Sequence, residues 1–295
     1  MQRTENLEPQ ERIIVALDVD LPSKAVSIVE KLKDRVGMFK IGLELMHNTL
    51  AVFATAPKDQ TLRELDALRE LIGLTKEQLF YDGKFMDIPN TVAGASKAPV
   101  KLGAKMFNVH TLGGAKMLED ALKVAKKSGE NFPLVLGVTA LTSLSHDDFV
   151  QMGIFEPMNI ANPSELQEAK DRELSTLVKD LALFAQEFET WEGGYLGLDG
   201  VIASPRELPI IRRYCQPEFL VVTPGVRPAW AAKGDQKRVM TPREAIALGA
   251  DYIVVGRPIT NPPPEIGSPE RAVDLIAEEI RQGLEDRRKQ EAVVA

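Results

Sequence analysis

The sequence predicts an α/β protein, a single-domain (β/α)8 TIM barrel with two long loop insertions. Eight short apolar segments typical of β-strands alternate with longer segments whose apolar residues recur at helical spacing. The residues at the ends of these apolar segments are repeatedly polar, as is typical of the catalytic face of such a barrel.

The expected strands cover residues 13–17, 38–41, 79–81, 106–109, 134–138, 200–202, 219–222 and 252–255. Parallel strands are buried on both faces and therefore appear as continuous apolar runs, as these do. Eight runs that alternate with helices fit a closed barrel better than an open sheet.

Amphipathic helices are expected between the strands, for example at residues 23–33, 115–127, 174–188 and 242–248. Thr241 is positioned to cap the last of these, with Pro242 in its first turn. The single cysteine, Cys215, continues an apolar helical pattern, so we expect it to pack as an inert side chain.

The whole chain, residues 1–295, is interpreted as one domain with flexible ends at 1–11 and 286–295. Two segments are longer than ordinary connections: residues 56–78, which contain the charged helical stretch TLRELDALREL, and residues 145–170, rich in Asn, Pro and Gly. Both are expected to face solvent, and the second is alternatively an active-site lid.

Composition excludes several classes of function. The formal net charge is −7, and no cluster of Lys and Arg interleaved with aromatic residues is present, so no nucleic-acid partner is expected. The most apolar stretch, residues 132–144, is too short to span a bilayer, and the polar N-terminal residues do not resemble a signal peptide. We therefore expect a cytoplasmic protein with no membrane partner.

Polar residues and glycines gather where the strands end, which in this fold is the catalytic face. They are Asp18, Lys40, Asp82, Lys84, His110, Thr139, Ser204, Gly225, Gly256 and Arg257. One such residue is usually a helix cap, but their recurrence after strand upon strand favours a functional site.

The densest motif is YDGKFMDIPNT, at residues 81–91. Asp82 and Lys84 are two residues apart, so they point to the same side if the strand continues. Asp87 follows where the chain leaves the strand. A lysine between carboxylates keeps its proton, so Lys84 is better suited to act as an acid than as a nucleophile. A structural ion pair at the barrel rim is the alternative interpretation.

Lys40 adds a second cation, which gives an expected alternation of Lys40, Asp82, Lys84 and Asp87. Such an array suits a reaction that builds negative charge on carbon, because a lysine can stabilise the carbanion and then protonate it.

A second constellation is VTPGVRP at residues 222–228, with GDQKR at 234–238 and VGRP at 255–258. The loops after strands seven and eight are the usual phosphate site of this fold. Glycines there let backbone amides approach an anion, and Arg227 or Arg257 can bind phosphate oxygens through a bidentate fork. The alternative is a surface ion pair for Arg257, and solvent exposure in a mobile loop for Arg227 and Gln236.

No metal or cofactor site is expected. The three histidines, His47, His110 and His146, show no HxH or HExxH spacing, and there is no dinucleotide fingerprint, Walker loop or CxxC motif. His110 either orients the carboxylates of the site or fills a position at the rim.

At these residues the sequence resembles the orotidine 5'-phosphate decarboxylase family, from VALDVD near residue 15 to VVGRPIT near residue 260. The DxKxxD pattern alone is shared with sugar-phosphate decarboxylases and synthases of the same superfamily. DIPNT together with TPGVRP and GDQ is more specific.

The resemblance implies a cofactor-free enzyme of pyrimidine biosynthesis that converts orotidine 5'-phosphate (OMP) to UMP and CO2. It implies that Asp82 stands beside the substrate carboxylate and that Lys84 protonates C6 of the pyrimidine after CO2 departs. It also implies a homodimer with shared active sites. The implied substrate-binding residues are Asp18 with Lys40 at the ribose, Thr142 or Ser143 at the pyrimidine, and Arg227, Gln236, Gly256 and Arg257 at the 5'-phosphate. Asp87, Ile88 and Thr91 would reach into the partner's site.

Two alternatives remain open at this stage. One is a metal-dependent enzyme of the 3-hexulose-6-phosphate synthase type, which uses a related DxKxxD site with Mg2+. The other is a non-catalytic barrel that binds a nucleotide phosphate, although a pure binder has little need for a charged array that is costly to desolvate.

Overall fold

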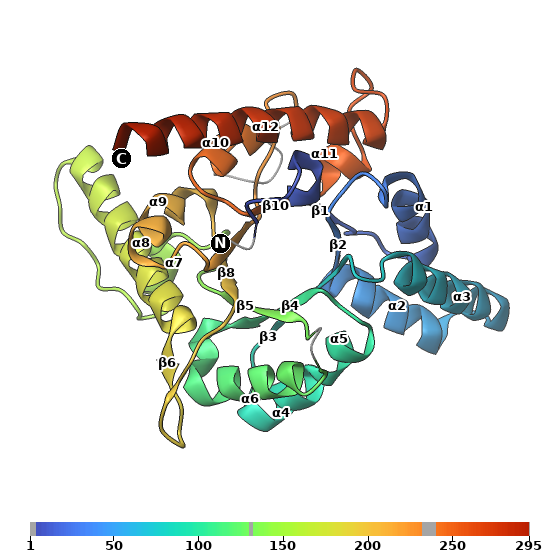
Figure 1. Ribbon diagram of the computed structural model, residues 1–295. Coiled ribbons are helices and arrows are strands. Elements are labelled where there is room, and N and C mark those ends of the chain that lie inside the picture. Colours follow the sequence, from blue (N-terminus) through green and yellow to red (C-terminus); the bar gives the residue numbers. More distant parts are fainter. Residues whose placement is uncertain (1–3, 130–131, 232–239, 295) are drawn as a thin grey trace.

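The computed structural model describes residues 4–129, 132–231 and 240–294, and its centre is a closed parallel barrel (Figure 1). The barrel strands follow the order β1-β10-β9-β8-β5-β4-β3-β2, and every neighbouring pair is parallel. This arrangement confirms the predicted (β/α)8 barrel.

Each expected strand is present. The barrel strands are β1 (Ile13–Ala16), β2 (Met38–Gly42), β3 (Leu79–Phe85), β4 (Met106–His110), β5 (Leu134–Val138), β8 (Gly200–Ile202), β9 (Leu220–Thr223) and β10 (Tyr252–Val255). The bounds agree with the prediction to within one residue except at β3, which continues four residues further, through Lys84 to Phe85.

Helices surround the barrel (Figure 1). They are α1 (Pro22–Leu32), α2 (Leu43–Thr55), α3 (Lys58–Leu74), α4 (Pro89–Ala95), α5 (Lys97–Lys101), α6 (Gly114–Lys126), α7 (His146–Gln151), α8 (Pro163–Gln186), α9 (Leu208–Tyr214), α10 (Pro242–Ala247), α11 (Arg257–Thr260) and α12 (Pro269–Val294). Short 3-10 helices are η1 (Pro9–Arg12), η2 (Thr111–Gly113) and η3 (Pro205–Glu207). Thr241 caps α10 as expected, because its hydroxyl accepts from the Glu244 backbone N–H.

Alternate residues of each strand face two separate apolar cores. The barrel interior is filled by side chains such as Ile14, Phe80 and Val222, while the layer between strands and helices holds the larger core. Cys215 lies in that outer core, as predicted, and burial raises the pKa of its thiol. This alternation also sends Lys40, Asp82 and Asn108 toward the barrel axis.

Both insertions contain helices. Residues 56–78 include α3, as the charged pattern indicates, and α3 packs on α1. Residues 145–170 contain α7 and the start of α8, which begins 11 residues before the expected position 174. His146, expected in a polar loop, is instead a buried residue of α7 whose Nε2 lies 2.7 Å from Glu173 Oε2.

The described parts of both ends, which were expected to be flexible, make contacts or continue a helix. Thr4 is buried and donates to Asp251 Oδ1 at 2.9 Å, and α12 continues to Val294. A two-stranded antiparallel hairpin, β6 (Phe188–Glu189) with β7 (Tyr195–Leu196), was not expected. Within the described residues, no helix combines the length and apolarity that crossing a membrane requires.

Candidate active site

Asp82 lies at the centre of a charged cluster at the carboxyl ends of β1, β2 and β3. Lys40 Nζ lies 3.0 Å from Asp18 Oδ1 and 3.1 Å from Asp82 Oδ2. Lys84 Nζ donates to both carboxylate oxygens of Asp82, at 2.7 Å and 2.8 Å. Negative and positive groups therefore alternate in the order Asp18, Lys40, Asp82, Lys84.

The cluster is desolvated at its centre and open at its ends. Lys40 and Asp82 are 8% and 6% exposed, whereas half of the Asp18 side chain and about a third of the Lys84 side chain reach solvent. Gly42 leaves room for this packing, because a Cβ at that position would lie 2.7 Å from Lys40 Nζ.

Burial and charge act in opposite directions on the two buried groups. Burial favours the neutral acid at Asp82, but the charges of Lys40 and Lys84 outweigh it and hold the pKa of Asp82 below its ordinary value. Burial likewise favours neutral Lys40, but Asp82 and Asp18 outweigh it and raise the pKa of Lys40. Both groups therefore remain charged at neutral pH.

Lys84 has a left-handed backbone, with φ of 46°. A residue with a Cβ in this region costs about 1 to 3 kcal/mol, and such strain persists only where surrounding contacts hold it. The expected contact between Lys84 and Asp82 is thus present, but regular strand alternation does not produce it. A distorted backbone turns the lysine back onto the carboxylate.

Asn108 of β4, which was not among the residues expected from the sequence, forms hydrogen bonds with both Asp82 and Lys84. Its Nδ2 donates to Asp82 Oδ1 at 2.7 Å, and its Oδ1 accepts from the Lys84 backbone N–H at 2.7 Å. An asparagine inside an apolar strand was the available signal, since a buried amide needs partners for its donors and acceptors.

A hollow of about 520 Å3 adjoins the cluster and holds the predicted anion-binding residues. Its lining includes Asp18, Lys40, Arg227, Gly256 and Arg257. Arg227 is buried and Arg257 is the first residue of α11, behind the cap residue Gly256. The loops after β9 and β10 thus meet the charged cluster in one cavity, which can place an anion beside Lys40.

Asp87 does not join the ion-pair array of its own chain. It is exposed, and its Oδ1 accepts from the backbone N–H of Ile88 at 2.6 Å. Among the described residues, it makes no ion pair within 4.0 Å. The second outer carboxylate of the cluster is Asp18, which contacts Lys40 at the end of the cluster away from Lys84. Asp87 and Thr91 instead line a second hollow, of about 350 Å3, which Lys84 also borders.

The remaining predicted residues lie around this mouth or outside the described chain. Thr142 and Ser143 are exposed in the turn after β5, where the Leu144 backbone N–H donates to Leu141 O. Gln236 lies outside the described residues.

His110, at the end of β4, is half-buried beside the cluster. Burial and then the charge of Lys84 lower its pKa, against a smaller opposing effect of Asp82. His110 is therefore neutral at pH 7, and its side chain can serve as a hydrogen-bonding group without adding charge.

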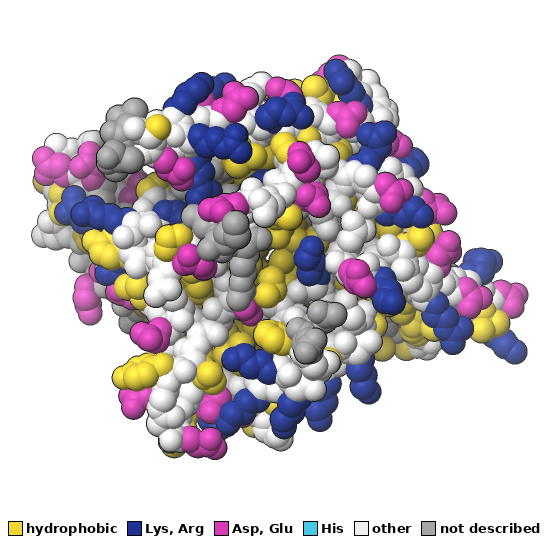
Figure 2. Space-filling view, viewed as in Figure 1, with side chains coloured by type: hydrophobic (Ala, Val, Ile, Leu, Met, Phe, Trp, Pro, Cys, Tyr) yellow, Lys and Arg dark blue, Asp and Glu magenta, His cyan; other side chains and the backbone are white. Residues whose placement is uncertain are grey.

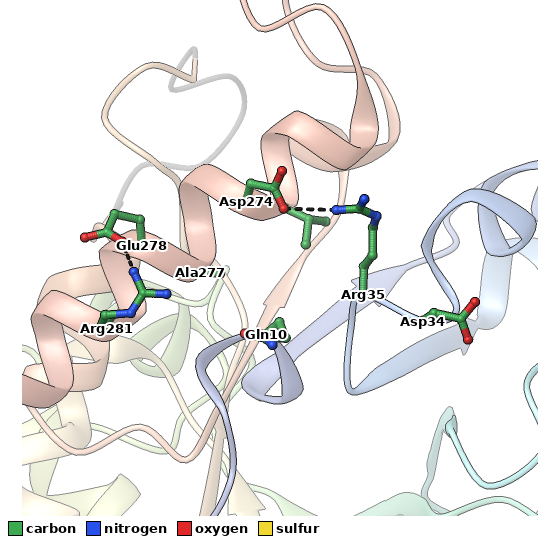
Figure 3. A pocket seen from close by; sticks show the side chains of 8 residues that line it. Gln10, Asp34, Arg35, Asp274, Ala277, Glu278 and Arg281 are labelled. Atoms are coloured by element: carbon green, nitrogen blue, oxygen red, sulfur yellow. Dashed lines mark hydrogen bonds and ion pairs between the residues drawn. The ribbon is translucent and has the colours of Figure 1, made fainter.

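A separate hollow of about 610 Å3 lies at the other end of the barrel, where η1 precedes β1 (Figure 3). Four of its charged side chains form two ion pairs: Arg35 pairs with Asp274 at 3.2 Å, and Arg281 pairs with Glu278. Across the face drawn in Figure 2, Lys and Arg are similarly mixed with Asp and Glu. Nothing in this hollow resembles the desolvated array at the barrel mouth.

No group of three or more His, Cys, Asp or Glu is placed to hold a metal ion within the part of the chain that the structure describes. The cations of the charged cluster at the mouth are Lys40 and Lys84. An ammonium held beside a carboxylate in a desolvated cavity can stabilise negative charge on a nearby carbon and then donate a proton to it.

Comparison with known proteins agrees with this geometry. A profile of the Orotidine 5'-phosphate decarboxylase / HUMPS family matches residues 11–268. The chain belongs to this family. The orotidine 5'-phosphate decarboxylase of Geobacter sulfurreducens is 41% identical over 279 residues, covering 94% of this chain and 98% of that protein. The one from Moorella thermoacetica is 40% identical over 285 residues, covering 95% and 96%.

A solved structure of the same family shares the barrel. The crystal structure of orotidine 5'-phosphate decarboxylase from Lactobacillus acidophilus aligns with a TM-score of 0.59 at 32% identity, and it covers 91% of this chain and 98% of that chain. Family membership thus agrees with the motifs DGKFMDIPNT and TPGVRP, which carry the charged cluster and the arginine-lined hollow.

Proposed function

We propose that this chain is an orotidine 5'-phosphate decarboxylase, which converts OMP to UMP and CO2 in pyrimidine biosynthesis in the cytoplasm. The observation that carries the proposal is the pair of short contacts from Lys84 Nζ to Asp82, inside an array that opens into an arginine-lined hollow. The names of the relatives support the same substrate.

The two hollows suggest how the substrate binds. The 5'-phosphate occupies the space beside Arg227 and Arg257, with Gly256 giving its backbone access to the anion and Gln236 contributing from its loop. Asp18 and Lys40 then face the ribose, and Thr142 or Ser143 meets the pyrimidine edge.

The chemical step needs no electron sink in this account. The bond between C6 and the carboxylate carbon breaks, CO2 leaves, and the electron pair stays on C6. The ammonium of Lys84 stabilises this charge and donates its proton to C6, which gives UMP; water then returns a proton to the neutral amine. Asp82 keeps Lys84 oriented toward the reacting carbon.

The proposal includes a homodimer with shared active sites. Apolar side chains are exposed around this mouth, including Ile88 at 66%, Met86 at 55% and Leu43 at 47%. Asp87, Ile88 and Thr91 are themselves exposed. A two-fold contact through this surface would bury these apolar side chains and bring the partner's copy of the segment to the site.

A spectrophotometric assay with OMP tests the function. We expect conversion to UMP without added metal and no loss of rate in EDTA. Absence of conversion would reject the decarboxylase proposal. Conversion of OMP that EDTA removes and Mg2+ restores would contradict a metal-free chemical step.

A further inference from the structure

Asn108 stands opposite an irregularity in the barrel sheet. Tyr81 pairs with Phe107 and Phe85 pairs with Val109, so the register between β3 and β4 shifts between these two pairs. Three residues of β3, Asp82 to Lys84, therefore face the single residue Asn108. A bulge of this kind leaves backbone groups without their ladder partners.

The side chain of Asn108 supplies a partner for one of these backbone groups and also binds the Asp82 carboxylate. Its Oδ1 accepts from the Lys84 backbone N–H, and its Nδ2 donates to Asp82 Oδ1, each at 2.7 Å. The partners fix the orientation of the amide, because a backbone N–H can only donate and an ionised carboxylate can only accept. One amide thus ties together the two residues that flank Gly83.

We propose that Asn108 is a positioning residue of the active site: its amide holds the Lys84 backbone in the left-handed conformation that directs Nζ onto Asp82 and toward the reacting carbon. The statement that Nζ points toward a reacting carbon rests on the decarboxylase function proposed above. Asn108 itself is 0% exposed, so it acts through Lys84 and Asp82 and does not touch the substrate.

Loss of the amide has a defined structural consequence. The Lys84 backbone N–H would lose Asn108 Oδ1 as its acceptor, and with it a contact that favours φ of 46°. Lys84 would then relax to negative φ, and its side chain would swing away from Asp82. A displacement of about 1 Å of a catalytic group can lower turnover about 100-fold.

The first test compares Asn108→Leu with wild type in the OMP assay. Leucine keeps a similar volume and removes both hydrogen bonds, so we expect kcat to fall about 100-fold. KM should change little, because the arginine-lined hollow is untouched. Thr111→Val is the matched control. Thr111 is also buried, and its hydroxyl donates to Val138 O at 2.6 Å. Loss of this hydrogen bond should leave kcat unchanged.

Asn108→Asp tests the same role through the pH dependence of kcat, which a purely structural role would not change. This variant also provides the test if Asn108→Leu does not fold. When ionised, the introduced carboxylate can accept from Lys84 but repels Asp82; when protonated, it can donate to Asp82 as the amide does. The ratio of the variant's kcat to that of wild type should therefore rise as the pH falls. A ratio independent of pH would contradict the proposed donation to Asp82.

A double-mutant cycle tests whether Asn108 acts through Lys84. In a Lys84→Ala background, Asn108→Leu should cause no further loss of kcat, because the group that it positions is already absent. Multiplicative losses would overturn the proposal, since Asn108 would then act independently of Lys84.

Crystal structures of both Asn108 variants test whether Asn108 positions Lys84, and they do not depend on an activity assay. We expect Lys84 to have negative φ and to have lost its contacts with Asp82 in Asn108→Leu. A Lys84 that keeps its left-handed backbone and both contacts would overturn the positioning role. If wild type does not decarboxylate OMP, the proposed function fails, while this structural comparison still decides the role of Asn108.

Discussion

Lys84 Nζ lies 2.7 Å and 2.8 Å from the two carboxylate oxygens of Asp82, although both residues belong to one strand and only Gly83 separates them. The ion pair is possible because Lys84 has a left-handed backbone. Lys40 approaches the same carboxylate from β2. Asp82 therefore binds two cations at the barrel mouth, one buried and one within reach of a substrate.

Lys40→Met should destabilise the protein. The variant removes a cation from a carboxylate that stays buried, and breaking a buried pair costs about 3 kcal/mol or more. Because the folded-state pKa of Lys40 is raised, its contribution is complete at neutral pH and is lost only as the pH rises through that pKa. Urea denaturation at neutral pH measures the difference.

The matched control for this variant is Lys24→Met, which breaks the exposed pair between Lys24 and Asp20. Exposed pairs contribute little, so the free energy of unfolding should hardly change. Equal effects of the two substitutions would contradict the account of a desolvated cluster.

His110→Gln should make stability less dependent on pH on the acidic side of neutrality. The pKa of His110 is lowered in the folded state, so the unfolded chain binds its proton first as the pH falls. Wild type should therefore lose more free energy of unfolding than the variant between about pH 7.5 and about pH 5.5. An equal or smaller loss in wild type would contradict the lowered pKa.

Arg257→Ala should weaken the use of OMP far more than that of orotidine, which lacks the phosphate. Arg257 lines the hollow next to Gly256, and phosphate binding remote from C6 can also drive loop closure, so kcat can fall together with affinity. Steady-state kinetics with both substrates measure the two losses. Equal losses would place the phosphate elsewhere.

Mixing two inactive variants tests the shared site. Lys84→Ala and Asp87→Ala should each be nearly inactive alone. After joint unfolding and reassembly, random pairing makes half of the dimers mixed, and each mixed dimer has one intact site, so about one quarter of wild-type activity should return. No recovery, with mixed dimers shown to form, would place Asp87 in the site of its own chain.

The barrel was predictable because each strand is an apolar run and polar site residues lie at or near the carboxyl ends of these runs. Asp18, Lys40 and Asp82 were brought together as expected, since the carboxyl ends of β1, β2 and β3 meet at one rim. Arg227 and the glycines of the hollow were expected from the loops after the seventh and eighth strands, the usual phosphate site of this fold. These features depend on local pattern and on the geometry of the fold alone.

The bulge in β3 was not predictable from periodicity. The left-handed Lys84 donates its backbone N–H to the side chain of Asn108 on another strand, and residue spacing does not report such a tertiary contact. The early start of α8 had a signal that went unused, because Asn162 caps the helix and Pro163 occupies its first position. The position of Asp87 outside the array also depends on how the chain leaves β3.

Turnover of Lys84→Ala, measured beside its affinity for UMP, tests the central claim most directly. We expect kcat for OMP to fall about 1,000-fold or more, because the variant lacks the acid, while UMP binding stays measurable. Lys84→Arg should also fail, since a guanidinium differs in shape and rarely gives up its proton. Wild-type turnover in either variant would contradict the assignment of Lys84 as the catalytic acid.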